Sequence, residues 1–170
     1  NDAGPRVTER NLQTYQVLGG LRGKLNAIDG SWEVYASHGS TKIHERSPGS
    51  VLASSLRNLT SAADGGQSLC DGGYNPFGNN PLSTDCADYL VASPVRDVTL
   101  KQDAFEANFQ GKLADLPAGE ARFAAGVGYR RNSYVNEPDA ILTAGDVVGV
   151  PFTRYSEGSS NVKEAFVELL

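Results

Sequence analysis

The chain contains two cysteines and two histidines, side chains that commonly form disulfides or bind metals. Cys70 and Cys86 lie in one polar stretch rich in Gly, Asn, Pro and Asp. An even cysteine pair in such a loop predicts a disulfide, which would stabilise the loop by about 3 kcal/mol in the chain-entropy model. The alternative is a metal site with His38 and His44. Because cysteines that bind zinc usually lie about two to four residues apart, we favour the disulfide and expect no metal.

Aromatic side chains in the irregular stretches are the candidates for ligand contact. Their rings offer large contact areas at a binding surface, and they are Tyr74, Phe77, Tyr89, Phe152 and Tyr155. The alternative interpretation is that the same rings pack the loops together. The residue types alone leave both open.

Catalytic chemistry has little support in the sequence. Glu164 and Glu168 are a conceivable carboxylate pair for acid–base catalysis. The sequence contains no serine elbow, phosphate-binding loop or metal-binding helix motif. We therefore predict no catalytic residue and no cofactor, and we do not expect an enzyme.

Residues 98–131 organise the elements that would position these side chains. In 105–113 the odd positions are largely apolar and the even ones polar, and 121–129 repeat the alternation around the turn at 114–120. Strand side chains point alternately to opposite faces, so this pattern predicts a hairpin with one apolar and one polar face. A tilted strand crosses a bilayer in about 9–11 residues, which each run provides. Soluble hairpins of this length also exist.

The rest of the chain follows the same alternation in three further places. We predict strands over residues 15–25, 32–37 and 161–170, a turn at 26–30, and a short helix within 50–63 with Ser50 as N-cap. Residues 1–10, 64–86 and 136–160 are expected to be irregular. Trp32 is either an interfacial belt residue or an ordinary core residue. The residues expected on the polar, interior face include Glu106, Arg122, Arg130, Glu164 and Glu168.

The connections between these strands alternate between short and long. Outer-membrane barrels show this asymmetry, with short turns on the periplasmic side and long loops outside. A net charge of −5 argues against a nucleic-acid partner. The sequence has no apolar run long enough for a transmembrane helix, whereas barrel strands need only every second residue apolar. The predicted fold is all-β: a meander of about five antiparallel strands forming part of a transmembrane barrel.

Several short sequence motifs resemble those of a known family. They include Tyr15-Gln16-Val17-Leu18-Gly19-Gly20, Asn75-Pro76-Phe77-Gly78, the turn Leu116-Pro117-Ala118-Gly119 and the strand Phe123-Ala124-Ala125-Gly126-Val127-Gly128-Tyr129-Arg130. The sequence resembles the β-barrel region of TonB-dependent outer-membrane receptors over all but about its first ten residues. The resemblance places residues 1–170 in part of a barrel of about 22 strands and leaves out the plug domain. We therefore expect a piece of a longer protein.

The resemblance implies a receptor in the bacterial outer membrane that imports a siderophore or similar scarce nutrient. Its expected partners are that nutrient or metal chelate, outer-membrane lipid, and the TonB complex through the missing plug. A passive porin-like channel and a secreted, soluble β-rich binding module are the alternatives. The substrate does not follow from the sequence.

Overall fold

The computed structural model describes residues 4–77 and 80–170, so Gly78 of the quoted phrase and the first three residues lie outside it. The chain divides into two compact units. We call residues 1–12, 43–98 and 136–156 the loop unit, and residues 13–42, 99–135 and 157–170 the sheet unit.

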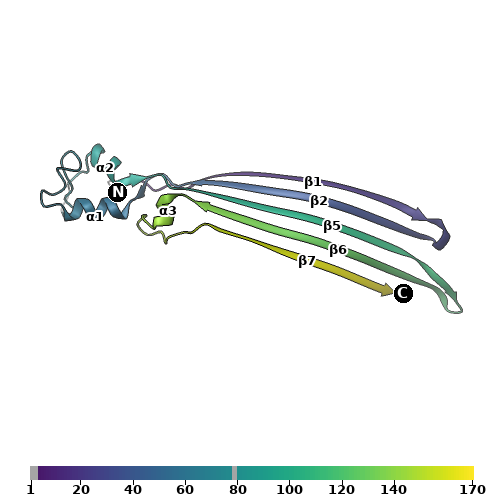
Figure 1. Cartoon of the computed structure of the whole chain (residues 1–170). Helices are drawn as coiled ribbons and strands as arrows, with labels where there is room; N and C mark the ends of the chain where they lie inside the picture. Colours follow the sequence, from purple (N-terminus) through teal and green to yellow (C-terminus); the bar gives the residue numbers. More distant parts are fainter. Residues whose placement is uncertain (1–3, 78–79) are drawn as a thin grey trace. The chain divides into compact units, whose positions relative to one another are not determined.

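Five long strands form one antiparallel sheet in sequence order, which confirms the predicted meander (Figure 1). They are β1 (Glu9–Leu25), β2 (Gly30–Arg46), β5 (Val95–Leu116), β6 (Gly119–Pro138) and β7 (Ser156–Leu169). The sheet is not closed, so β1 and β7 each have one neighbour in it.

All five strands are longer than their alternating patterns, and the difference is clear in three of them. β1 begins at Glu9, β2 continues to Arg46 and β7 begins at Ser156. Backbone pairing does not require an apolar face, and polar cross-strand pairs also join strands. One such pair is Arg10 with Glu45, where Nε lies 2.6 Å from Oε2. The apolar pattern ends before the strands do, so a prediction based on that pattern underestimates the length of the strands.

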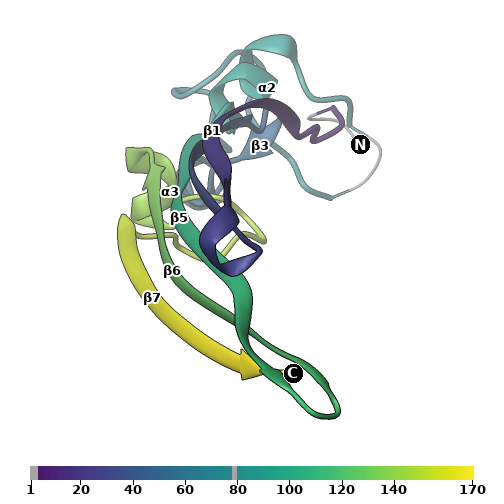
Figure 2. The same cartoon turned by 90° about the vertical axis from the view of Figure 1, so that its right-hand side faces the viewer.

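Both predicted tight turns are present and belong to the sheet unit. The 3-10 helix η1 (Asn26–Ile28) links β1 to β2, and Asp29 follows it in the left-handed conformation at φ 40°. Residues 117–118 link β5 to β6, and this hairpin projects beyond the end of β7 (Figure 2). The two long connections belong to the loop unit. Short and long connections are thus sorted between the units.

The predicted helix is α1 (Ala53–Ser61), but its expected cap is wrong. The N-cap residue is Leu52, which makes no side-chain cap hydrogen bond. The carboxylate of Asp146 accepts hydrogen bonds from the Ser54 amide at 2.7 Å and the Ser54 hydroxyl at 2.5 Å. A residue from the second long connection therefore does what a local N-cap usually does.

Ser50 instead lies in a small second sheet. It belongs to β3 (Ser50–Val51), which pairs with β4 (Val91–Ala92), with Ser50 opposite Ala92. The Val148 amide donates to the Val51 carbonyl at 2.9 Å, and the Ala53 amide donates to the Asp146 carbonyl at 3.0 Å. These bonds join the two long connections within the loop unit.

Two helices occur where irregular chain was predicted. Ser83 caps α2 (Thr84–Leu90), and Asp139 caps α3 (Ala140–Ala144). Both caps accept a hydrogen bond from a backbone amide of the first turn, at 3.1 Å and 2.9 Å. Helices this short carry too little periodicity to be recognised in a polar stretch.

The buried apolar side chains of the described residues all belong to the loop unit. They are Leu59, Cys70, Cys86, Leu90 and Val147. The first four form one cluster, against which Val51, Leu56 and Leu82 also pack. A core of this kind holds α1 and α2 together.

Each helix in the described part of the chain is too short or too polar to span a membrane.

Candidate functional site

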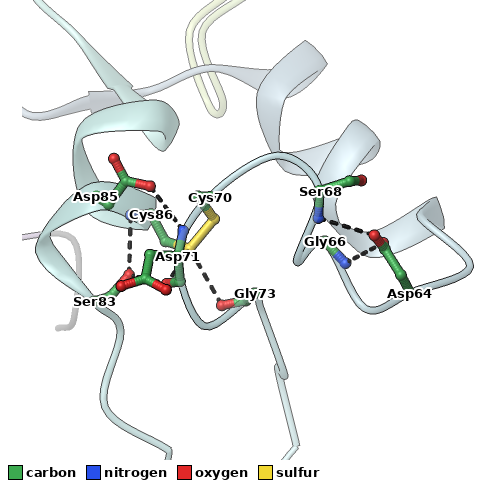
Figure 3. Close-up of a disulfide and its surroundings, with 9 residues drawn as sticks. All are labelled: Asp64, Gly66, Ser68, Cys70, Asp71, Gly73, Ser83, Asp85 and Cys86. Atoms are coloured by element: carbon green, nitrogen blue, oxygen red, sulfur yellow. Dashed lines mark hydrogen bonds between the residues drawn. A yellow bond between two sulfur atoms is a disulfide. The ribbon is translucent and has the colours of Figure 1, made fainter.

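The cysteines predicted to pair do lie together (Figure 3). Cys70 and Cys86 form a disulfide with a Cα–Cα distance of 4.9 Å, within the usual range for this bond. Cys86 is fully buried and Cys70 nearly so. The bond is therefore part of the loop unit's core.

Polar contacts on both sides fix the position of the disulfide. The Ser83 hydroxyl accepts from the Cys86 amide at 3.1 Å and donates to the Asp71 carbonyl at 2.6 Å. The Asp71 amide donates to the Asp85 carboxylate at 2.7 Å. The segments that carry the two cysteines are thus joined by hydrogen bonds as well as by sulfur, as Figure 3 shows.

A second carboxylate organises the turn that precedes Cys70. Asp64 accepts hydrogen bonds from the Gly66 and Ser68 amides, both at 2.9 Å. Hydrogen bonds from Ser68, followed by the one from Gly66, lower the pKa of Asp64 below its ordinary 3.8. Such bonds favour the charged carboxylate.

Of the five predicted ligand-contact aromatics, two pack against the disulfide core. Tyr74 and Tyr89 are half-buried beside this cluster. The Tyr89 hydroxyl accepts a hydrogen bond from the Asn58 side chain at 3.5 Å. These two rings fit the alternative interpretation, in which aromatic side chains hold the loop together.

The other three aromatics are largely exposed. Phe77 is 81% exposed, Phe152 60% and Tyr155 55%. The Arg154 guanidinium lies 5.2 Å from the centre of the Phe152 ring, a cation–π contact. Two of the five predicted residues thus pack on the disulfide core, and the other three are exposed.

The metal alternative has no support in the geometry. Both cysteines are in the disulfide, and each histidine pairs with an aspartate: His38 Nδ1 lies 2.6 Å from Asp103, and His44 Nδ1 lies 2.7 Å from Asp97. Within residues 4–77 and 80–170, no group of three or more His, Cys, Asp or Glu side chains is placed to hold a metal ion.

The predicted polar face of the sheet is linked by cross-strand contacts. The Tyr35 hydroxyl on β2 donates to the Glu106 carboxylate on β5, which also accepts from Asn108 at 2.7 Å. On β6 and β7, Arg130 and Glu164 form an ion pair at 3.3 Å. Side chains from several strands therefore form a polar network on this face.

A large open hollow lies on the sheet unit beside this network. Its volume is about 980 Å³, and its lining includes Arg22, Glu33, Glu106 and Glu168. Glu164 and Glu168 do not form a catalytic pair, since four residues along a strand separate them by about 13 Å. Acid–base carboxylate pairs at glycosidic bonds lie about 5–9.5 Å apart.

The opposite face of the sheet is apolar and uncovered in the part of the chain that the structure describes. Phe109 on β5 and Phe123 on β6 pack with ring centres 5.3 Å apart. Phe105 remains 46% exposed and Val127 52%. The same holds on the outer strands, where Leu21 is 69% and Val167 74% exposed.

Trp32 lies across a glycine of the neighbouring strand. A Cβ built on Gly23 would lie 2.6 Å from Trp32 Nε1, so the ring occupies the space a side chain at Gly23 would need. Trp32 is half-buried. Gly23 thus makes room for the ring beside the short turn.

The comparisons with known proteins return nothing for this chain. No family model matches it, and no curated protein or solved structure does.

Proposed function

We propose that the chain forms part of the transmembrane β-barrel of a TonB-dependent outer-membrane receptor that imports a siderophore or similar nutrient. The observation that carries this proposal is the sheet with one apolar, uncovered face and one polar, cross-linked face. A soluble sheet normally buries its apolar face against a second layer. Large exposed apolar patches mark membrane or protein interaction surfaces.

Lipid is the cover that fits both faces. Barrel strands in the outer membrane alternate apolar side chains toward lipid with polar side chains toward the lumen. The rings of Phe105, Phe109 and Phe123 would then lie in hydrocarbon, and Glu106 and Arg130 would line the interior. Because unpaired strand edges are not tolerated in lipid, β1 and β7 would pair with further strands in the complete barrel.

The division of connections between the units also supports the proposal. Both short turns belong to the sheet unit, and both long connections to the disulfide-closed loop unit. This matches short periplasmic turns and longer extracellular loops. On this proposal the loop unit lies on the extracellular side, where Phe77, Phe152 and Tyr155 are available to an arriving ligand. Import would depend on TonB and on a plug domain outside this chain.

Neighbouring residues on one strand give a sharp test. Phe109 and Gln110 lie at the same height of β5 on opposite faces, so Phe109→Cys and Gln110→Cys would each carry a nitroxide label in the membrane-embedded protein. We expect the label at 109 to collide with oxygen, which concentrates in lipid, and the label at 110 with a water-soluble nickel chelate. Equal accessibility at the two positions would overturn the lipid assignment.

Cell fractionation and uptake test the remaining parts. The protein is expected in the outer-membrane fraction, and recovery in the soluble fraction would favour a secreted binding module instead. Uptake of an iron chelate should stop when TonB is deleted. Uptake that continues without TonB would indicate a passive porin-like channel.

A further inference from the structure

A small cavity in the loop unit is lined by an unusual set of side chains. Its volume is about 220 Å³, and it is distinct from the hollow on the sheet unit. Three arginines and one glutamate line it: Arg6, Arg10, Arg96 and Glu45. Positive charge therefore exceeds negative charge around a cavity in a chain whose net charge is −5.

Glu45 holds two of the arginines in place. Arg10 Nε lies 2.6 Å from one carboxylate oxygen of Glu45, and Arg96 Nη2 lies 3.0 Å from the other. Glu45 is 16% exposed, whereas the Arg10 side chain is 60% exposed. Each guanidinium carries five N–H donors, so one bond to Glu45 leaves most donors available.

Arg96 has a donor that nothing in the described residues satisfies. Its Nε is buried and has no hydrogen-bond partner there. Buried polar groups nearly always have a partner, so this donor is an exception in the chain's interior. Because Nε has almost no accessible surface, an anion in the cavity would instead meet the terminal N–H groups of Arg96, whose side chain is 35% exposed.

The remaining lining defines the shape of the ligand. Thr8, Ser47 and Thr153 also line the cavity and carry hydroxyl groups, whereas Pro94, Leu142 and Val150 are apolar. Pockets for drug-sized ligands have volumes of about 300–1,000 Å³, so this one suits something smaller. The lining fits an anionic group with a short apolar portion attached.

We propose that this cavity binds a small organic anion, with its carboxylate or phosphate group held by Arg10 and Arg96 and its apolar portion against Leu142 and Val150. Arginine is well suited to this role because its planar fork matches both oxyanions. The site does not depend on the outer-membrane assignment, since every lining residue belongs to the loop unit.

Calorimetric titration of the purified chain in detergent tests the proposal with three probes. They are benzoate, phenyl phosphate and neutral benzamide. We expect saturable binding of at least one anion, at least tenfold tighter than benzamide, and the ratio of benzoate to phenyl phosphate distinguishes the two acidic groups. Absence of saturable anion binding, or equal binding of benzamide, would overturn the proposal.

Substitutions identify the site. Arg96→Gln should weaken the anion about tenfold or more, whereas Arg57→Gln, at an exposed arginine of α1 in the same unit, should leave binding unchanged. Glu45→Gln removes the competing carboxylate and should tighten binding. If the cluster is only a structural ion-pair network, Glu45→Gln will not increase affinity and Arg57→Gln will match Arg96→Gln. Circular dichroism of each variant establishes that it is folded.

Discussion

Reduction of the Cys70–Cys86 disulfide is expected to open the loop unit locally. The bond closes a loop with a sequence separation of 16 residues. For a loop of this length the chain-entropy model gives about 3 kcal/mol. Reduction leaves both sulfur atoms in the buried cluster, so the measurement isolates the cross-link from the packing of the side chains.

Trypsin provides a local assay of this opening. Arg57 is the only lysine or arginine between Arg46 and Arg96, and it lies on α1, whose Leu59 packs against the disulfide. When opening is fast compared with cleavage, the cleavage rate follows the population of the open state. Since 1.4 kcal/mol corresponds to a factor of ten, reduction should speed cleavage at Arg57 about 100-fold.

The control is the double variant Cys70→Ala with Cys86→Ala. Its cleavage should be fast with or without reductant, whereas the wild-type rate should depend on reductant. A wild-type increase of less than about threefold would refute the reasoning, because the hydrogen bonds around Ser83 and Asp85 would then suffice to hold the loop closed. Mass spectrometry of the fragments assigns the cleavage to Arg57.

Three further predictions concern individual contacts. The hydrogen bonds that lower the pKa of Asp64 stabilise the loop unit above the ordinary pKa of 3.8, and their contribution is lost as pH falls through the folded-state pKa. Hydrogen exchange of the Gly66 and Ser68 amides should show this loss. Asp64→Asn should abolish the pH dependence. Gly23→Val should displace the Trp32 ring and destabilise the sheet by about 1–3 kcal/mol. The displacement should appear as a shift in Trp32 fluorescence emission. The control is Gly19→Ala, where a Cβ meets nothing within 4 Å and the emission should stay unchanged. Asp146→Ala should destabilise α1 by about 0.5–2 kcal/mol, as loss of a cap does; denaturant titration measures this, and an unchanged midpoint would contradict the capping role.

The parts of the fold that were predictable from sequence are those with local causes. Alternation over residues 105–113 and 121–129 separates an apolar from a polar face within each strand, so it predicts the hairpin and its turn. Asn26 and Asp29 indicated the other turn through their own backbone preferences. The disulfide was also predictable, since the polar composition around Cys70 and Cys86 and the spacing of the two cysteines are local features.

The features that sequence reasoning missed depend on distant residues. The carboxylate that caps α1 comes from Asp146, far along the chain, so the local sequence wrongly favours Ser50 as the cap. Strand ends such as Arg46 are held by cross-strand pairing and carry no apolar pattern. The anion cavity combines residues near 6–10, 45–50, 94–96 and 142–153, and no short stretch reveals that they meet.

The bonds between residues 51–54 and 146–148 have a mechanical consequence. The backbone bridge of Leu52 with Val147 and the Ser54–Asp146 contacts fasten one long connection to the other at the start of α1. We therefore expect a displacement that begins near Phe152 to reach α1, which packs on the disulfide core, through Asp146. The two long connections are thus expected to move together, although Ser54 and Asp146 are 92 residues apart in the chain.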